Sequence, residues 1–150
     1  MGLQEKVMTE IKAAMKAKNS VALESLRAIK SAILIAQTDK GAGGELSEED
    51  EIKLVQKLVK QRKDSASIFN EQGRNDLADP ELAQVAVIEK FLPAQLSEEE
   101  IEKVVVNTIT SVGATGMQDM GKVMGIVSKE LAGQADGKTI STIVKSKLSS

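Results

Sequence analysis

The chain has 150 residues, of which 41% are hydrophobic and 28% are charged, and its formal net charge is −2 at pH 7. It contains no cysteine and no histidine, which excludes disulfides, thiolate metal ligands and histidine-based catalysis. Its two aromatic residues are Phe69 and Phe91, so the core has to be built from aliphatic side chains and alanine, most of which also favour helices.

Apolar residues recur at helical spacing over residues 3–18, which predicts an amphipathic first helix. Asn19 interrupts this pattern and offers a cap for a second helix, which is expected to fade near residues 38–40. The glycine-rich segment 41–44 is expected to be a loop. Glu45 follows it where a phosphate-binding P-loop has lysine and then serine or threonine, so a plain loop is favoured.

A serine followed by three acids, at residues 47–50, predicts the start of a third helix, because these side chains satisfy free amide groups and suit the helix dipole. Its buried stripe is expected to extend to Ile68 and Phe69, and Gly73 is a natural stop.

A fourth helix is expected to begin at Asp79 or a little earlier, with Asp79 as its cap and Pro80 in its first turn. It is expected to end before Pro93. The segment 93–96 therefore predicts a domain boundary.

Residues 97–100 predict a full capping box for a fifth helix, which Gly113 is expected to stop. A sixth helix is expected to span residues 117–131, and a turn at 133–137 should lead into the last helix.

These patterns predict an all-α protein made of two helical bundles. The N-terminal part has four helices over residues 1–93, and the C-terminal part has three helices over residues 94–150. The apolar run 32–36 is far too short to cross a bilayer, and no signal-peptide pattern is present, so we expect a cytoplasmic location and no membrane partner.

The acidic runs 48–50 and 98–100 could serve as metal ligands or acid–base pairs, but both lie at predicted helix starts, where capping is strongly favoured. No serine stands out as an activated nucleophile, although a Ser–Lys arrangement stays open. We expect no catalytic residue, no metal and no cofactor.

Two groups of cations are candidate phosphate contacts. The group at the end of the third helix consists of Lys60, Arg62, Lys63 and Arg74. For this group, the favoured alternative to phosphate binding is that the cations simply lie on a helix face exposed to solvent. The group in the last two helices consists of Lys122, Lys129, Lys138, Lys145 and Lys147. This second group makes the end of the chain locally basic.

Gly121 and Gly125 lie four residues apart on one face of the sixth helix. A glycine inside a helix costs about 1 kcal/mol relative to alanine, so something should offset that cost. Close packing against a neighbouring helix is the favoured interpretation. The close approach of a nucleic-acid backbone is the alternative.

Several separated motifs resemble the YqeY family. They are Lys60–Ser65, Glu71–Leu77, Phe91–Ser97, Asp119–Gly125 and Ala135–Lys138. YqeY proteins are similar to the C-terminal helical and tail domains of GatB, a subunit of the glutamine-dependent tRNA amidotransferase. The resemblance implies two α-helical bundles, the second with three helices.

The resemblance also implies a ligand class, because the tail domain of GatB helps to hold tRNA. Carried over, Lys122 becomes the first candidate RNA contact, and the other lysines of the last two helices become weaker ones. The chemistry does not carry over, since the N-terminal cradle of GatB and the glutamine-hydrolysing subunit have no counterpart here. Carbon–nitrogen ligase activity with glutamine as amido donor is thus implied by homology alone.

The leading hypothesis is therefore a stand-alone GatB-tail-like module that binds tRNA or related structured RNA, with no DNA expected. One alternative is a protein-interaction module whose groove is lined by Met117, Met120 and Met124. Another is an accessory of an amidotransferase that has no RNA contact and no activity of its own.

Overall fold

The computed structural model describes residues 2–41 and 44–149. These residues form seven α-helices and two short 3₁₀ turns, and none of them forms a β-strand, so the predicted all-α class is confirmed. The chain divides into two compact units, residues 1–92 and 93–150. No helix within the described ranges combines the length and the apolarity needed to cross a membrane.

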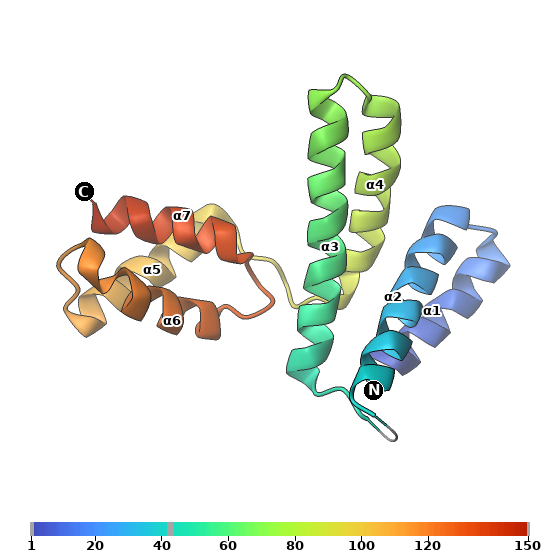
Figure 1. Ribbon diagram of the computed structural model, residues 1–150, viewed down its shortest axis with the longest axis horizontal. Helices are drawn as coiled ribbons and strands as arrows, with labels where there is room; N and C mark the ends of the chain where they lie inside the picture. The colour runs from blue at the N-terminus through green and yellow to red at the C-terminus, as the bar shows by residue number, and fades with distance from the viewer. Residues whose placement is uncertain (1, 42–43, 150) are drawn as a thin grey trace. The chain divides into compact units, whose positions relative to one another are not determined.

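Two helical hairpins make up the first unit. Its elements are α1 (Leu3–Ala17), α2 (Ser20–Asp39), α3 (Glu48–Glu71), α4 (Asn75–Ile88) and the 3₁₀ turn η1 (Glu89–Phe91). The α1–α2 hairpin lies beside the half of the α3–α4 hairpin that is farther from the α3–α4 turn (Figure 1). The other half of the α3–α4 hairpin projects beyond it.

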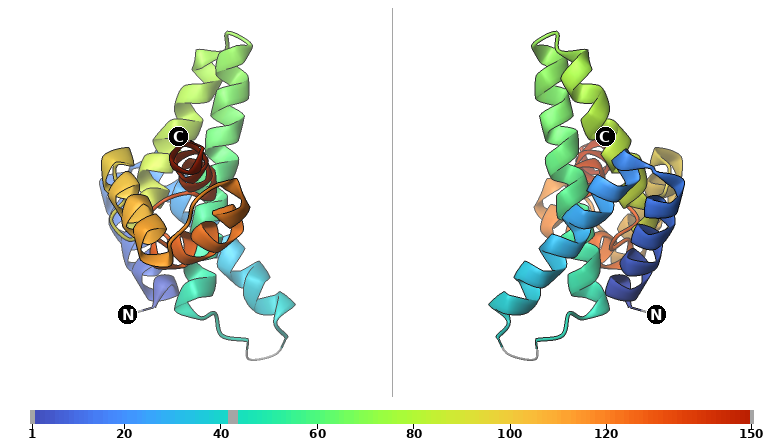
Figure 2. Two further views of the ribbon diagram at one scale, coloured as in Figure 1. Left: turned by 90° about the vertical axis from the view of Figure 1, so that its left-hand side faces the viewer. Right: turned by 90° about the vertical axis from the view of Figure 1, so that its right-hand side faces the viewer.

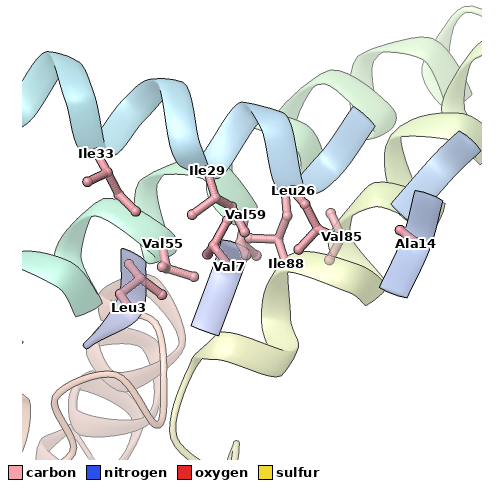
Figure 3. Close-up of a cluster of buried hydrophobic side chains, with 10 residues drawn as sticks. All are labelled: Leu3, Val7, Ala14, Leu26, Ile29, Ile33, Val55, Val59, Val85 and Ile88. Atoms are coloured by element: carbon pink, nitrogen blue, oxygen red, sulfur yellow. The ribbon is translucent and has the colours of Figure 1, made fainter. Parts of the chain in front are cut away.

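An aliphatic core joins the four helices of this unit (Figure 3). Ile29 of α2 and Ile88 of α4 are completely buried in it, and the half-buried Phe91 packs against it. The cluster consists of Leu3, Val7, Ala14, Leu26, Ile29, Ile33, Val55, Val59, Val85 and Ile88.

The start of α3 is held by a reciprocal capping box. The backbone N–H of Asp50 donates to Ser47 Oγ at 3.1 Å, and the backbone N–H of Ser47 donates to Asp50 Oδ2 at 3.2 Å. Lys40, which follows α2, donates to the same carboxylate. These bonds, led by the one from Lys40, lower the pKa of Asp50 to about 2. The predicted cap at Ser47 is confirmed.

This depressed pKa predicts a pH-dependent contribution of Asp50 to stability. A carboxyl whose pKa is lower in the folded state stabilises the fold above its ordinary pKa of 3.8, and that contribution is lost as the pH falls through about 2. Asp50→Asn should therefore be less stable than the unchanged chain at neutral pH, and the difference should shrink between about pH 4 and about pH 2. Urea titrations followed by circular dichroism measure it. A difference that stays constant over that range would contradict the role of the carboxylate.

Helix α4 starts before Asp79, as the prediction allowed, but the predicted cap at Asp79 and the predicted place of Pro80 in the first turn are wrong. The helix begins at Asn75, so Pro80 stands inside it rather than in its first turn. Because the helix starts earlier, Ala78 lies inside it and is fully buried. This gain in packing is available only if the helix continues through Pro80. Pro80 and Asp76 are both exposed, so water can reach the Asp76 carbonyl that loses its helical hydrogen-bond donor.

The apolar stripe of α3 was also predicted to stay buried as far as Ile68 and Phe69, and this prediction is wrong. Ile68 is 53% exposed, and Phe69 is only half-buried. Both lie in the part of α3 that projects beyond the α1–α2 hairpin, where the core cluster has no member.

Three helices and one 3₁₀ turn make up the second unit. They are α5 (Glu98–Val112), η2 (Met117–Asp119), α6 (Met120–Glu130) and α7 (Gly137–Leu148). Their core consists of Ile101, Val105, Val123, Val127, Leu131, Ala135, Ile140, Val144 and Leu148. The segment before α5 is tied to the α6–α7 turn, since the backbone N–H of Leu96 donates to the Gln134 carbonyl at 3.0 Å.

Local caps fix the helix ends of the second unit. The backbone N–H of Glu100 donates to Ser97 Oγ at 3.2 Å, but the Glu100 carboxylate accepts from the Ser97 hydroxyl instead of its backbone N–H. The full capping box predicted at residues 97–100 is thus only half formed. Gly113 ends α5 with φ +67°, as predicted, and Asp136 caps α7 by accepting from the Thr139 N–H at 2.7 Å.

Candidate nucleic-acid interface

Helix α6 has an apolar side and a side of small residues. Val123 and Val127 are fully buried against α5 and α7. Gly121, Gly125 and Ser128 recur at spacings of four and three residues, which places them on the opposite side of the helix, and all three are exposed. We call Gly121, Gly125 and Ser128 the glycine track.

The close helix packing expected at Gly121 and Gly125 is absent from the described part of the chain. A Cβ atom added at either position would meet nothing within 4 Å outside the local helix backbone. The reason is geometric: each glycine lies two residues from Val123, about 200° around the helix axis, so it faces away from the core. The alternative, a ligand backbone that approaches the glycines, stays a prediction.

The open space at these glycines predicts that Gly125→Ala stabilises the second unit by about 1 kcal/mol, because alanine is the better helix former and meets no obstacle. Thermal unfolding of the two chains measures it. Gly113→Ala is the matched control and should have the opposite sign, destabilising by about 1 kcal/mol, because Gly113 has a positive φ. Destabilisation by Gly125→Ala would show that the glycine is required inside the fold.

Two lysines flank the glycine track and two more follow the outer face of α7. Lys122 and Lys129 lie beside the track on α6, and both are exposed. Lys138 and Lys145 lie seven residues apart on α7, which places them on one exposed side of that helix. No ion pair is recorded for these four lysines within the described residues. Their ammonium groups can therefore contact phosphate without first giving up a carboxylate partner.

Two hydroxyl groups share the outer side of α7 with its lysines. Thr142 Oγ1 donates to the Lys138 carbonyl at 2.9 Å, and Ser149 Oγ donates to the Lys145 carbonyl at 2.7 Å. The sequence-based prediction missed both residues. The spacing of four, three and four residues through positions 138, 142, 145 and 149 is the signal that identifies them.

The fifth lysine of this group is already engaged. Lys147 Nζ lies 2.6 Å from Glu102 Oε1 of α5, and the lysine is half-buried. This pair ties α7 to α5, so Lys147 acts first as a structural contact.

The cations predicted as phosphate contacts in the first unit all have acceptors nearby. Lys60 pairs with Asp64 at 2.8 Å, and Lys63 pairs with Glu89 of η1 at 3.1 Å. These pairs are exposed and weak, yet they partly neutralise the positive potential that a phosphate would meet.

Both arginines of that group donate within the fold. Arg62 donates from Nε to Gln84 Oε1 at 2.8 Å and from a terminal nitrogen to the Leu58 carbonyl at 3.1 Å. Arg74 holds both carboxylate oxygens of Asp76, at 3.1 and 3.0 Å, which raises the pKa of Arg74 and lowers that of Asp76. The structure thus concentrates unpaired candidate cations in the second unit.

Among residues 2–41 and 44–149, no three His, Cys, Asp or Glu side chains gather in a group suited to a metal ion. The acids that begin α3 and α5 lie in first helical turns, where they complement the helix dipole.

Comparison with known proteins places the chain in a family. The model of the family described as Yqey-like protein matches residues 4–148. The "Altered inheritance of mitochondria protein 41, mitochondrial" of Clavispora lusitaniae is 31% identical over 131 residues, which cover 86% of this chain and 74% of that protein. Its counterpart in Pyrenophora tritici-repentis is 30% identical over 133 residues, which cover 87% of this chain and 71% of that protein.

A second kind of relative belongs to an amidotransferase. One of the subunits of the glutamyl-tRNA(Gln) amidotransferase of Thermococcus gammatolerans is 35% identical over 104 residues, which are 67% of this chain and 17% of that protein. The match thus covers a small part of the larger protein. The resemblance seen in the sequence motifs is confirmed, and the chain belongs to the YqeY-like family.

Proposed function

We propose that the chain binds tRNA or related structured RNA, and that residues 94–150 form a GatB-tail-like domain which makes the contact. The observation that carries the proposal is a set of four exposed lysines for which the described residues show no ion pair, two beside the open glycine track on α6 and two on the outer face of α7. The amidotransferase relative is named for glutamyl-tRNA(Gln), which supports the same ligand class.

The proposed mechanism is recognition of phosphates and of RNA shape. Residues 94–150 contain no aromatic side chain and no arginine, so they offer neither a stacking platform for bases nor a bidentate guanidinium. Lysine supplies point charges that neutralise phosphates, and the glycine track lets a backbone approach α6 closely. Binding should then depend strongly on salt and little on base sequence.

We assign no catalytic step to this chain. The amidotransferase relative shares only 17% of its length with it, so that relative's activity is a property of a much larger protein. An accessory role beside an amidotransferase, with no RNA contact and no turnover by the chain alone, stays an alternative to the proposal. Detectable glutaminase activity of the pure chain would contradict it. A cytoplasmic location stays a prediction, since the names of two relatives place those proteins in mitochondria.

The alternative hypothesis of a protein-interaction module needs an accessible groove lined by methionines. This groove is less accessible in the structure than the sequence suggested. Met117 is exposed, but Met120 and Met124 pack against the core of the second unit. A partner helix would therefore find one accessible methionine of the three, and this observation favours the RNA hypothesis.

Filter binding of tRNA at salt concentrations from about 50 mM to about 200 mM tests the proposal. Four phosphate contacts predict a slope of about −3 to −4 in a plot of the logarithm of the association constant against that of the salt concentration. A slope near zero, or binding no tighter than that of an acidic control protein, would overturn the proposal.

A further inference from the structure

One flank of the α1–α2 hairpin is exposed and combines apolar with cationic side chains. The two helices run side by side in opposite directions (Figures 1 and 2). Gln37, near the end of α2, donates from Nε2 to Oε1 of Gln4, near the start of α1, at 3.4 Å. Residues that share a helical side with either glutamine therefore lie on one flank of the hairpin.

Helical spacing identifies the residues of this flank. On α1 they lie four, eight and eleven residues after Gln4, and on α2 they lie three, seven and ten residues before Gln37. At 100° per residue, each of them lies within about 80° of the glutamine on its own helix. We call the following residues the hairpin flank: Met8, Lys12, Met15, Arg27, Lys30 and Leu34.

The apolar members of the hairpin flank are open to solvent. Met8 is 37% exposed, Leu34 is 47% exposed and Met15 is 53% exposed. The core residues Val7 and Ala14 each precede one of the methionines, about 100° away around the helix axis. The methionines therefore lie beside the core of the first unit, with surface left for another molecule to cover.

The cations of the hairpin flank lie among these apolar residues. Lys12 and Arg27 are exposed, and Lys30 is half-buried. Within the described parts of the chain, no ion pair is recorded for any of the three. Three further charged residues border the flank, and they are Glu5, Lys16 and Glu24. Together these are four cations and two carboxylates, a formal charge of +2 in a chain whose net charge is −2.

We propose that the hairpin flank docks an acidic amphipathic helix of a partner protein. Its row on each helix spans seven residues, or about 10.5 Å, so a partner helix of two to three turns covers both rows. Apolar side chains of that helix would meet the two methionines and Leu34, and methionine adapts well to irregular apolar surfaces. Carboxylates beside its apolar stripe would face the three cations, which attract an acidic segment.

The mixture of side chains favours a helix over a nucleic acid as the occupant. An RNA backbone would meet the cations, but it would also press charged phosphates against Met8, Met15 and Leu34, which cannot replace the lost hydration. A helix with carboxylates on either side of an apolar stripe matches both kinds of residue. The hairpin flank thus differs in ligand class from the lysines of α6 and α7.

The test uses the full chain and two synthetic peptides. One is an amphipathic helix with leucines on one face and glutamates beside them, and the second has lysines in place of the glutamates. In fluorescence anisotropy the glutamate peptide should bind at least about tenfold more tightly than its lysine counterpart.

Variants of the apolar residues test the docking site itself. Met15→Ser with Leu34→Ser should weaken the glutamate peptide by at least about tenfold. Ile35→Ser is the matched control, because Ile35 follows Leu34 directly, is 63% exposed and lies about 100° farther round α2. It should leave binding unchanged.

Variants of the cations test the charge preference. Arg27→Gln with Lys30→Gln should reduce the tenfold difference between the two peptides to about threefold or less. Lys6→Gln with Lys57→Gln removes two exposed charges of the first unit that lie outside the flank, and it should preserve the difference.

Each other outcome would overturn the proposal. Equal binding of the two peptides, or an equal loss in Ile35→Ser, would mean unspecific apolar adhesion, and absence of binding would show that no acidic helix fits the flank. Displacement of the peptide by phosphatidylserine vesicles would assign the flank to a membrane surface. Displacement by tRNA, in a chain with glutamine at positions 122, 129, 138 and 145, would assign it to RNA. Self-association that disappears in the Met15/Leu34 double variant, measured by light scattering, would assign it to a second copy of the chain.

Discussion

Replacing Ile88 by alanine should lower the free energy of unfolding of the first unit by about 3 kcal/mol. Ile88 is completely buried where α4 meets α2 and α3, and its removal leaves a cavity lined by other members of the same core cluster. The transition temperature should fall by about 15 °C, which a thermal scan followed by circular dichroism measures.

Leu82→Ala is the matched control, because Leu82 lies on the same helix and is 43% exposed. The change removes a similar number of carbon atoms and keeps a good helix former, so stability should stay within about 0.5 kcal/mol. A loss in Leu82→Ala as large as in Ile88→Ala would show that α4 packs by another face.

Much of the fold could be predicted because its determinants are local. Ser47 and Gly113 act within a few residues of their own positions: Ser47 begins α3 and Gly113 ends α5 where the sequence pattern places these boundaries. The start of α4 could not be predicted in this way. It depends on the burial of Ala78 against α3, which is a tertiary gain that overrides the local preference of Pro80 for a first turn.

The candidate site was predicted only in part, for a similar reason. The pair Lys60–Asp64 joins residues four apart on one helix and could have been inferred from the sequence. Lys63 and Arg62 find their partners in Glu89 and Gln84, which are more than 20 residues away and become neighbours only when α4 folds back on α3. Likewise, four-residue spacing places Gly121 and Gly125 on one side of α6 but does not tell whether a helix covers that side.

Removing the four unpaired lysines should abolish most RNA binding. Replacing Lys122, Lys129, Lys138 and Lys145 by glutamine leaves the buried residues of α6 and α7 intact. Each lost phosphate contact reduces the salt slope by about 0.9, so the slope for tRNA should fall to near zero. The affinity at low salt should drop by about a hundredfold or more, because released counterions supply most of the binding free energy.

A second quadruple variant, with the same net charge as the first, distinguishes RNA contact by the lysines of α6 and α7 from attraction of RNA by the overall charge of the chain. Lysines 6, 12, 16 and 57 are exposed, and all four belong to the first unit. Their replacement by glutamine removes the same four charges, and if α6 and α7 make the contact it should change tRNA affinity by less than about threefold at 0.1 M salt, where charges that touch no phosphate are largely screened. If both quadruple variants lose binding equally, the RNA is held by the overall charge of the chain and not by α6 and α7. If only the first variant does, and its melting curve is unchanged, the lysines of these two helices form the contact surface.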